Sequence, residues 1–412
     1  MTDTLAQEPD LFTQPTYLPR VTRRDGRAIE EALAGPTLFN KGVSLAGAVI
    51  EATYAATDPP LLGRLREGGV PRLVDPQTTR LTGERFLTIQ QFERLPYRTD
   101  TPIRVDTPTS SSLAHLARSV MAFEQQVDAS WYLTAALPLY DQDFPSWLQH
   151  NDKLLEASCA ANGAGDLDRR KLIAQIAPGH KAIGQPELIV NRLADYPIDG
   201  VYVQPLRMDA TRDSVEKLVQ YVRFLRAITS LGVPVIASRV SAFGLVLNAL
   251  GIALFDSGLG EAEACNLANL NRAPRERETT GSSARGDRRI YLEQLKTTLT
   301  GRNATAILEN RPLRSRFVCS LGCCEHKGFE DLAERRRQHY LWVRDHEIEA
   351  LRARPTDQMR IDLVYEQLRD AREAGRVVRR ALTALGTAGP NFDHIDRWIA
   401  VLARETELSQ AA

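Results

Sequence analysis

The densest group of potentially reactive side chains is a cluster of cysteines. Cys319, Cys323 and Cys324 fall within six residues, and His339 follows fifteen residues after the last of them. Zinc takes thiolate and imidazole ligands in a tetrahedron, and a tight turn can aim several thiolates at one point. The pattern predicts a structural zinc site, because four protein ligands would leave no position open for a substrate.

The fourth zinc ligand stays open at the level of the sequence. His326 lies only two residues after Cys324, so one turn would have to bend sharply to use both. His339 stands on a predicted helix that can fold back onto the turn, and we expect it to be the ligand. The alternative is that these cysteines are small buried apolar residues without a metal.

Two aspartates end predicted strands. Asp256 ends the apolar run 252–256, and Asp75 ends the run 71–75. In a parallel barrel the carboxyl ends of the strands meet at one mouth, where barrel enzymes keep their catalytic groups. We therefore expect both aspartates to be catalytic. For Asp256 the alternative is a helix cap or an ion pair with an arginine, and for Asp75 it is a simple turn.

Amide and guanidinium groups follow several other predicted strands. These residues are Gln77, Gln175, Gln204, Arg207 and Arg239. Such groups can donate and accept hydrogen bonds at the edge of a polar ring. We expect these five residues to bind the substrate.

The elements that would position these residues alternate between strand and helix. The C-terminal part of this pattern has strands at 171–176, 200–204, 233–238 and 252–256, with helices at 185–195, 213–231 and 241–250. The weaker N-terminal part has strands at 43–46, 71–75, 102–105 and 129–136, with helices at 61–68 and 111–126. Alternating elements of these lengths indicate βαβ units around a parallel sheet.

Eight such strands predict an α/β fold of the TIM type, a (β/α)8 barrel, which needs about 250 residues plus insertions. An open doubly wound sheet is the alternative. The absence of a G-x-G-x-x-G motif after the first predicted strand counts against a dinucleotide-binding sheet.

The composition divides the chain into three expected regions. Residues 1–35 are expected to form an N-terminal arm, 36–289 the barrel, and 290–412 an appended region with the cysteine cluster and helices. Within the last region we expect a helix near 291–299 and long charged helices from about 328 onwards.

Charge and hydropathy restrict the classes of protein. The 52 basic and 52 acidic residues give no net charge, which argues against a broad electrostatic surface for nucleic acid. A content of 43% hydrophobic residues excludes disorder of the whole chain. No apolar run approaches the roughly 18 residues of a membrane span, and the N-terminus is not that of a secretory signal. With clustered thiols, this predicts a cytoplasmic protein without a membrane partner.

The order of these features resembles that of the tRNA-guanine transglycosylases, barrel enzymes that exchange guanine for a 7-deazaguanine. The residues that carry the resemblance are Gln175, the strand 200–204, Gly251-Ile-Ala-Leu-Phe-Asp256, the three clustered cysteines and Glu347-Ile-Glu-Ala-Leu351. The outer cysteines are five residues apart, as in the family's C-x-C-x-x-C. The resemblance covers 171–375, with a weaker match at Asp75.

The resemblance implies a pentosyltransferase that acts on the bond between base and sugar. Asp256 would attack or stabilise the anomeric carbon, and Asp75 would bind or protonate the base. The partner would be tRNA, DNA or a nucleoside, with phosphates contacted by the loop 267–289 and by Arg335 to Arg337. Structural zinc and a homodimer are further expectations.

Several segments depart from the family pattern. The base-reading loop Gly-Gly-Leu-Ala-Val-Gly-Glu of the family is here Gln204-Pro-Leu-Arg-Met-Asp209, and Asp-Ser-Gly-Gly-Phe-Gln is here Asp75-Pro-Gln-Thr-Thr-Arg80. The histidine of the family falls near 356–358, where this chain has none. We therefore expect a divergent member with an altered substrate.

Two other functions stay open. The first is a non-catalytic barrel that serves as a binding or scaffold subunit in a system for nucleic-acid modification or defence. The second is a barrel enzyme of unrelated chemistry, such as a lyase or an aldolase. Lys171 starts its predicted strand, which is the wrong end of a barrel for a Schiff base.

Overall fold

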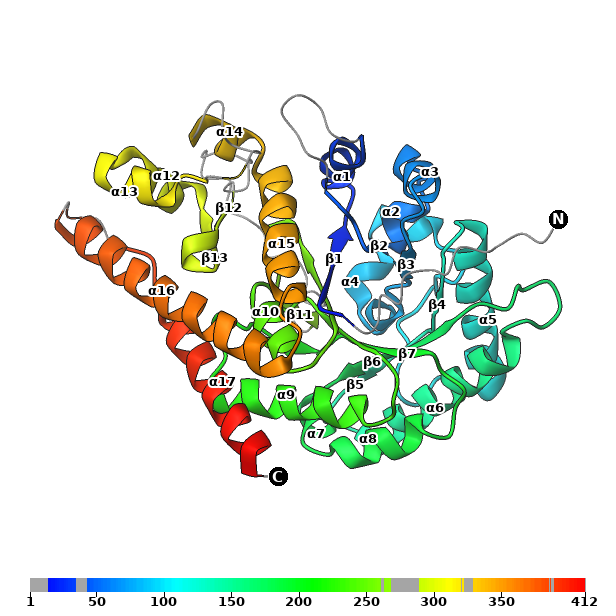
Figure 1. The fold of residues 1–412 in the computed structure, drawn as a ribbon. Coiled ribbons are helices and arrows are strands. Elements are labelled where there is room, and N and C mark those ends of the chain that lie inside the picture. Colours follow the sequence, from blue (N-terminus) through cyan, green and yellow to red (C-terminus); the bar gives the residue numbers. More distant parts are fainter. Residues whose placement is uncertain are drawn as a thin grey trace, which may run out of the picture.

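A barrel of parallel strands forms the centre of the molecule, with helices around it and a helical region against one side (Figure 1). The computed structural model describes residues 14–34, 43–260, 263–267, 289–319, 321, 329–384, 386 and 389–411. The barrel strands are β1 (Thr16–Val21), β2 (Ala48–Glu51), β3 (Arg72–Asp75), β4 (Tyr132–Leu133), β6 (Leu172–Pro178), β7 (Gly200–Val203), β9 (Val235–Ser238) and β10 (Leu254–Gly258).

The strands follow one another in the order β3-β2-β1-β10-β9-β7-β6-β4, and β5 (Pro138–Leu139) extends the pairing of β6. Neighbouring strands are parallel, and β1 pairs with β10 so that Leu18 lies opposite Asp256. A parallel bridge between Leu73 and Trp131 joins the two ends of the sheet. The prediction of a TIM-type barrel is therefore confirmed.

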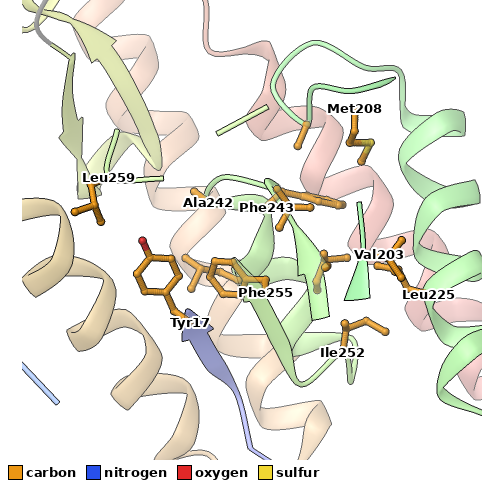
Figure 2. Close-up of a cluster of buried hydrophobic side chains, with 14 of the residues drawn as sticks. Tyr17, Val203, Met208, Leu225, Ala242, Phe243, Ile252, Phe255 and Leu259 are labelled. Atoms are coloured by element: carbon orange, nitrogen blue, oxygen red, sulfur yellow. The ribbon is translucent and has the colours of Figure 1, made fainter. Parts of the chain in front are cut away.

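Side chains alternate between the inside and the outside of the barrel, as the period of two along a strand requires. The apolar interior layer consists of Leu18, Val49, Leu73, Trp131, Leu133, Ile173, Tyr202, Ile236 and Leu254. Outward-facing neighbours such as Tyr17, Val203 and Phe255 belong to the cluster that packs against the surrounding helices (Figure 2). Each strand is thus buried on both faces.

Side-chain hydrogen bonds satisfy the first N–H groups of two of the barrel helices. Thr109 and Ser112 form a capping box at α5, and the Ser214 side chain accepts from the Lys217 N–H at α9. These helices are α1 (Gly26–Leu33), α2 (Ala52–Ala55), α3 (Pro60–Glu67), α4 (Glu84–Leu87), α5 (Ser110–Gln126), α6 (Phe144–Ala161), α7 (His180–Ile183), α8 (Pro186–Leu193), α9 (Val215–Thr229) and α10 (Phe243–Ala249). Two 3₁₀ helices, η1 (Thr78–Thr82) and η2 (Gln90–Arg94), lie in the connection from β3 to β4.

The C-terminal region combines a β-hairpin with helices. Its elements are β12 (Arg289–Leu292), η3 (Glu293–Leu295), β13 (Thr297–Thr300), α12 (Gly301–Glu309), α13 (Arg311–Phe317), α14 (Phe329–Glu334), α15 (Arg336–Arg352), α16 (Asp357–Ala384) and α17 (Asp393–Ala411). A short antiparallel pair joins β8 (Arg207–Met208) to β11 (Cys265–Asn266). No helix in the described ranges is long and apolar enough to cross a bilayer.

Helix α15 is attached to the barrel by a buried cation. The Arg344 guanidinium donates to Glu347 at 2.8 Å and lies 4.6 Å and 5.0 Å from the ring centres of Tyr291 and Tyr340. The same guanidinium lies 6.0 Å from the ring centre of Tyr17 on β1, whose hydroxyl donates to the Ser257 carbonyl of β10. The aromatic rings and the Glu347 carboxylate thus replace the interactions with water that the Arg344 guanidinium loses on burial.

Three predicted elements are wrong. Residues 102–105 form no strand, and the strand expected at 43–46 begins instead at Ala48. The first barrel strand is β1, inside the segment that we expected to be an arm. Its Pro19 lacks an N–H for a sheet ladder, which disguised the strand in the sequence. The helix expected near 291–299 is the hairpin β12–β13. The boundaries at 36 and 290 stay predictions.

Substitution of Gly244 by alanine tests the packing of α10 on β10. A Cβ at this position would overlap the ring of Phe255, so helix and strand would have to separate. We expect Gly244→Ala to lower the free energy of unfolding by about 1–3 kcal/mol in denaturant titrations.

Gly63→Ala in α3 is the matched control, because nothing lies within 4 Å of the added Cβ. Alanine favours a helix over glycine, so this variant is expected to gain about 0.5–1 kcal/mol. Equal effects of the two substitutions would contradict the close contact at Gly244.

Candidate functional site

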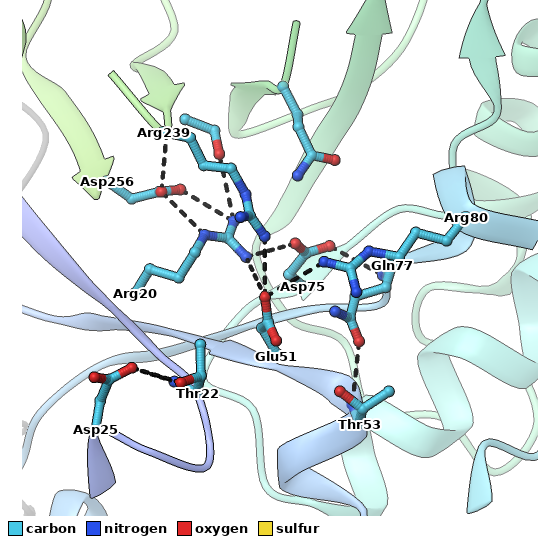
Figure 3. A network of polar contacts seen from close by, with 12 residues as sticks. Arg20, Thr22, Asp25, Glu51, Thr53, Asp75, Gln77, Arg80, Arg239 and Asp256 are labelled. Carbon is cyan, nitrogen blue, oxygen red and sulfur yellow. Dashed lines mark hydrogen bonds and ion pairs between the residues drawn. The ribbon is translucent and has the colours of Figure 1, made fainter. Parts of the chain in front are cut away.

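A polar layer lies above the apolar interior of the barrel, at the carboxyl ends of the strands (Figure 3). It begins two residues beyond the interior layer on six of the strands, where the alternation brings the next side chain inward. Its strand-borne members are Arg20, Glu51, Asp75, Gln175, Ser238 and Asp256. All are fully or almost fully buried except Glu51, whose side chain is 14% exposed.

Arg20 is the centre of this layer. Its Nη1 donates to Asp75 at 2.8 Å, its Nε donates to Asp256 at 3.2 Å, and its Nη2 contacts the Ser238 hydroxyl at 3.3 Å. The Tyr202 hydroxyl also contacts Arg20 and donates to Asp256. Burial lowers the pKa of Arg20, but Asp256, Tyr202 and Asp75 outweigh it and hold that pKa well above its ordinary value.

A second arginine group surrounds Glu51. The Glu51 carboxylate lies 2.9 Å from Arg239, 3.5 Å from Arg80 and 3.8 Å from Arg20. Burial raises the pKa of Glu51, yet Arg80, Arg239 and Arg20 together bring it below its usual value. Glu51 is therefore ionised at neutral pH, so it can accept a proton or a hydrogen bond but has no proton to donate.

The two groups carry opposite net charges. Arg20 is shared by two carboxylates, Asp75 and Asp256, so this inner group has an excess of negative charge. Glu51 is shared by Arg80 and Arg239, so the outer group has an excess of positive charge. An approaching anion would meet the positive group first.

Amide side chains continue the layer on the other side. The Gln77 N–H donates to Asp75 at 2.9 Å, and its Oε1 accepts from the Thr53 N–H at 3.3 Å. The Gln204 carbonyl oxygen accepts from Thr79 at 3.4 Å and from Gln175 at 3.5 Å. Gln204, which follows β7, thus contacts Gln175 on β6 and, through the Thr79 hydroxyl, the 3₁₀ helix η1.

Several atoms of the layer lack a hydrogen-bond partner. They are Gln77 Nε2, Gln175 Oε1 and Arg239 Nε, on residues that are at most 5% exposed. Gln77 and Arg239 also have left-handed backbones, each with φ of 57°. Such a backbone is uncommon for residues other than glycine, and it turns these two side chains away from the regular path of the chain.

A cleft of about 930 Å³ opens at the mouth beside this layer. Glu51 and Arg80 lie in its wall and belong to the polar layer as well, so they connect the cleft to the buried ion pairs. The remaining lining residues are Thr22, Arg23, Arg24, Thr53, Tyr54, Thr57, Ile89, Gln90, Gln91, Phe92 and Arg94. The lining therefore holds four arginines and one carboxylate.

The structure brings most of the predicted site residues together. Those that share the polar layer are Asp75, Gln77, Gln175, Gln204, Arg239 and Asp256. Arg207 is exposed on β8, in the separate pair with β11. Both predicted catalytic aspartates form an ion pair with Arg20, which was the alternative interpretation for Asp256. Whether they take part in catalysis stays a prediction.

Sequence reasoning missed the cations and the carboxylate that organise the layer. Arg20, Glu51, Arg80 and Tyr202 were not predicted as site residues. For Glu51 the signal was present, because Val49 and Glu51 alternate on one face of an apolar run that precedes a helix. The predicted strand at 43–46 ends before Glu51, so the position of strand ends in the prediction does not point to this residue.

Only part of the predicted zinc site lies within the described residues. Cys323, Cys324 and His326 lie outside the described residues. Cys319 is buried, and the His339 Nε2 lies 3.0 Å from the Tyr291 carbonyl oxygen, to which it donates. The part of the chain that the structure describes contains no group of three potential metal ligands. Zinc stays a prediction that elemental analysis can test.

Comparisons with known proteins identify no family for the chain. No family model matches the chain, and no curated protein matches it. An HpcH/HpaI aldolase/citrate lyase family protein from Burkholderia cenocepacia matches with 15% identity, a TM-score of 0.30, and 61% of this chain and 91% of that chain covered. Xylanase B from Clostridium stercorarium matches with 11% identity, a TM-score of 0.34, and 60% and 86% covered.

A lyase or mutase candidate from Burkholderia cenocepacia also matches, with 18% identity and a TM-score of 0.32 over 60% of this chain and 79% of that one. Likeness at these scores carries no argument about activity.

The predicted membership of the tRNA-guanine transglycosylases is wrong. No family model supports it, and the matching structures above carry the names of lyases, an aldolase family and a xylanase. Three further predictions rested on this membership and are wrong as well: the base exchange, the glycosyltransferase activity and the 7-deazaguanine substrate. The scaffold alternative is no better supported. Binding of nucleic acid or nucleosides and a homodimer remain untested predictions.

Replacement of Arg20 by methionine tests the central ion pairs. Asp75 and Asp256 would stay buried without their shared cation, and a broken buried pair costs about 3–5 kcal/mol. We expect Arg20→Met to lower the free energy of unfolding by this amount in urea titrations. Arg27→Met is the control, because its bond to Glu31 is exposed and worth at most about 1 kcal/mol. Similar losses in both variants would contradict the central role of Arg20.

Acid should weaken the polar layer through Asp75. Burial raises the pKa of Asp75, but Arg20 and Arg239 outweigh it and hold the pKa below its ordinary value. A carboxyl whose pKa is lowered by folding stabilises the protein above its unfolded pKa of about 4 and loses this contribution as the pH falls. We expect the free energy of unfolding of Asp75→Asn to fall less steeply between pH 5 and pH 2 than that of the wild type. Identical slopes would exclude this contribution.

Proposed function

We propose that the protein is a barrel enzyme that binds a small polar substrate in the cleft at the mouth, with Glu51 and Arg80 as the residues that contact it. One observation carries the proposal. The buried layer contains polar atoms without partners on Gln77 and Arg239, which contact the cleft residues Thr53 and Glu51. Both residues also hold a left-handed backbone.

These features are unfavourable for folding alone. A buried polar atom without a partner costs about 1–3 kcal/mol, and a left-handed non-glycine residue costs of the same order. Unpaired buried polar atoms and left-handed residues of this kind are concentrated at sites where a ligand supplies the missing contacts. The catalytic groups of barrel enzymes lie at this same mouth.

The charges around the cleft favour a substrate that carries or develops negative charge. Arg80 and Arg239 are fixed by Glu51 and would stabilise negative charge on substrate oxygens without reorganisation. Glu51 is ionised and would accept a proton or a hydrogen bond from the substrate. Asp75 and Asp256 lie behind Arg20 and act as positioning residues.

The experiment is a ligand search with paired variants. Thermal unfolding and calorimetry would be followed with a panel of small carboxylates, phosphate esters and sugars. A ligand at a hundredfold its Kd adds about 2.7 kcal/mol of stability. We expect Arg80→Gln to weaken binding by about tenfold or more, because a charged hydrogen bond is worth about 1.5–3 kcal/mol.

Arg80→Gln should fold, because Glu51 keeps Arg239 and Arg20 as partners. The control is Arg302→Gln on α12, an exposed residue away from the cleft, and it should bind like the wild type. A panel without any ligand, or equal binding by Arg80→Gln and the wild type, would overturn the proposal.

A further inference from the structure

Three of the four arginines that line the cleft fall into two kinds according to their ion pairs. Arg80 shares the Glu51 carboxylate with Arg239, so its charge is partly compensated within the protein. Arg23 and Arg94 are exposed at the rim, and neither forms an ion pair within the described part of the chain. Arg23 and Arg94 at the rim therefore add two positive charges to the excess positive charge of the group around Glu51.

Acidic neighbours do not neutralise the rim. Asp25, two residues after Arg23, accepts from the Thr22 N–H and hydroxyl at 3.1 Å and 2.6 Å and pairs with Arg337 at 2.9 Å. Glu93, next to Arg94, pairs instead with Arg98 at 3.8 Å. The carboxylates closest in sequence to the rim arginines are thus directed to other cations.

The two rim arginines come from separate segments. Arg23 lies in the connection between β1 and α1, and Arg94 ends η2 in the connection between β3 and β4. Gln90 and Gln91 of η2 line the same cleft. Two guanidinium groups and two amides from separate segments can surround one anion with several oxygens, as arginines do for phosphate.

Apolar side chains also line the cleft, besides the charged residues Glu51 and Arg80 and the two rim arginines. These are Tyr54, Ile89 and Phe92, and the Arg80 guanidinium lies 6.0 Å from the Phe92 ring centre. The volume of about 930 Å³ suits a ligand with more than one functional group. Such a ligand could place one end at Glu51 and the other at the rim.

We infer that the substrate carries a phosphate monoester end, held at the rim by Arg23 and Arg94, with its polar head at Glu51 and Arg80. The inference rests on the proposed function, since it concerns the same cleft. A phosphate monoester has close to two negative charges at neutral pH, which matches the two uncompensated cations.

The test compares phosphate esters with their parent compounds. The pairs are glycerol 3-phosphate with glycerol, ribose 5-phosphate with ribose, and 3-phosphoglycerate with glycerate, each titrated calorimetrically into the full chain. We expect a phosphate ester to bind at least about tenfold more tightly than its parent. The double variant Arg23→Gln/Arg94→Gln should lose this preference but still bind the parent. Arg302→Gln should keep the preference.

The outcomes separate the two proposals. If a ligand requires Arg80 but the double variant keeps the full preference for phosphate, the rim inference is overturned and the proposed function stands. The rim inference is also overturned if dicarboxylates such as malate gain as much from the rim arginines as phosphate esters do. If no compound binds in a manner that requires Arg80, both proposals are overturned.

Discussion

The buried ion pairs of Arg20 with Asp75 and Asp256 are the constraint on which the mouth of the barrel depends. They join the first strand to its neighbour β10 and, across the interior, to β3. A guanidinium removed from water requires carboxylates in good geometry, and each of these carboxylates would be costly without it. Tyr202 and Ser238 complete the shell of Arg20 from two further strands. The register of these strands therefore brings the charged groups together, and the ion pairs between those groups in turn stabilise the register.

How far the fold can be predicted depends on how each strand is buried. Strands such as β9 and β10 are buried on both faces, and their short, largely apolar runs between helices are visible in the sequence. Strand β1 contains Pro19 and ends at a charged turn, so local rules favour an extended arm there. Only its pairing with β10 and β2 makes it a barrel strand. The threonine-rich segment 297–300 likewise acquires its strand through pairing with β12.

The site was predictable to the extent that barrel geometry dictates it. Asp75, Gln175 and Asp256 could be placed at one mouth because parallel strands end at the same edge. Their roles could not be predicted, because their partner Arg20 stands on the strand that was missed. The same geometry explains the failed family resemblance. In Gly251-Ile-Ala-Leu-Phe-Asp256 the inward Leu254, the outward Phe255 and the polar Asp256 at the mouth are what a barrel strand requires in any family.

The zero net charge of the chain does not reveal the excess of positive charge that lines the cleft. The chain has 52 basic and 52 acidic residues, yet the cleft is lined by four arginines and one carboxylate. The imbalance arises because nearby carboxylates are engaged elsewhere, Asp25 with Arg337 on α15 and Glu93 with Arg98. Helix α15 thus contributes to the electrostatics of the mouth without lining it, because it withdraws a carboxylate from the rim. The local charge of the cleft depends on which cation each carboxylate pairs with in the folded protein. A count of charges along the sequence therefore does not reveal it.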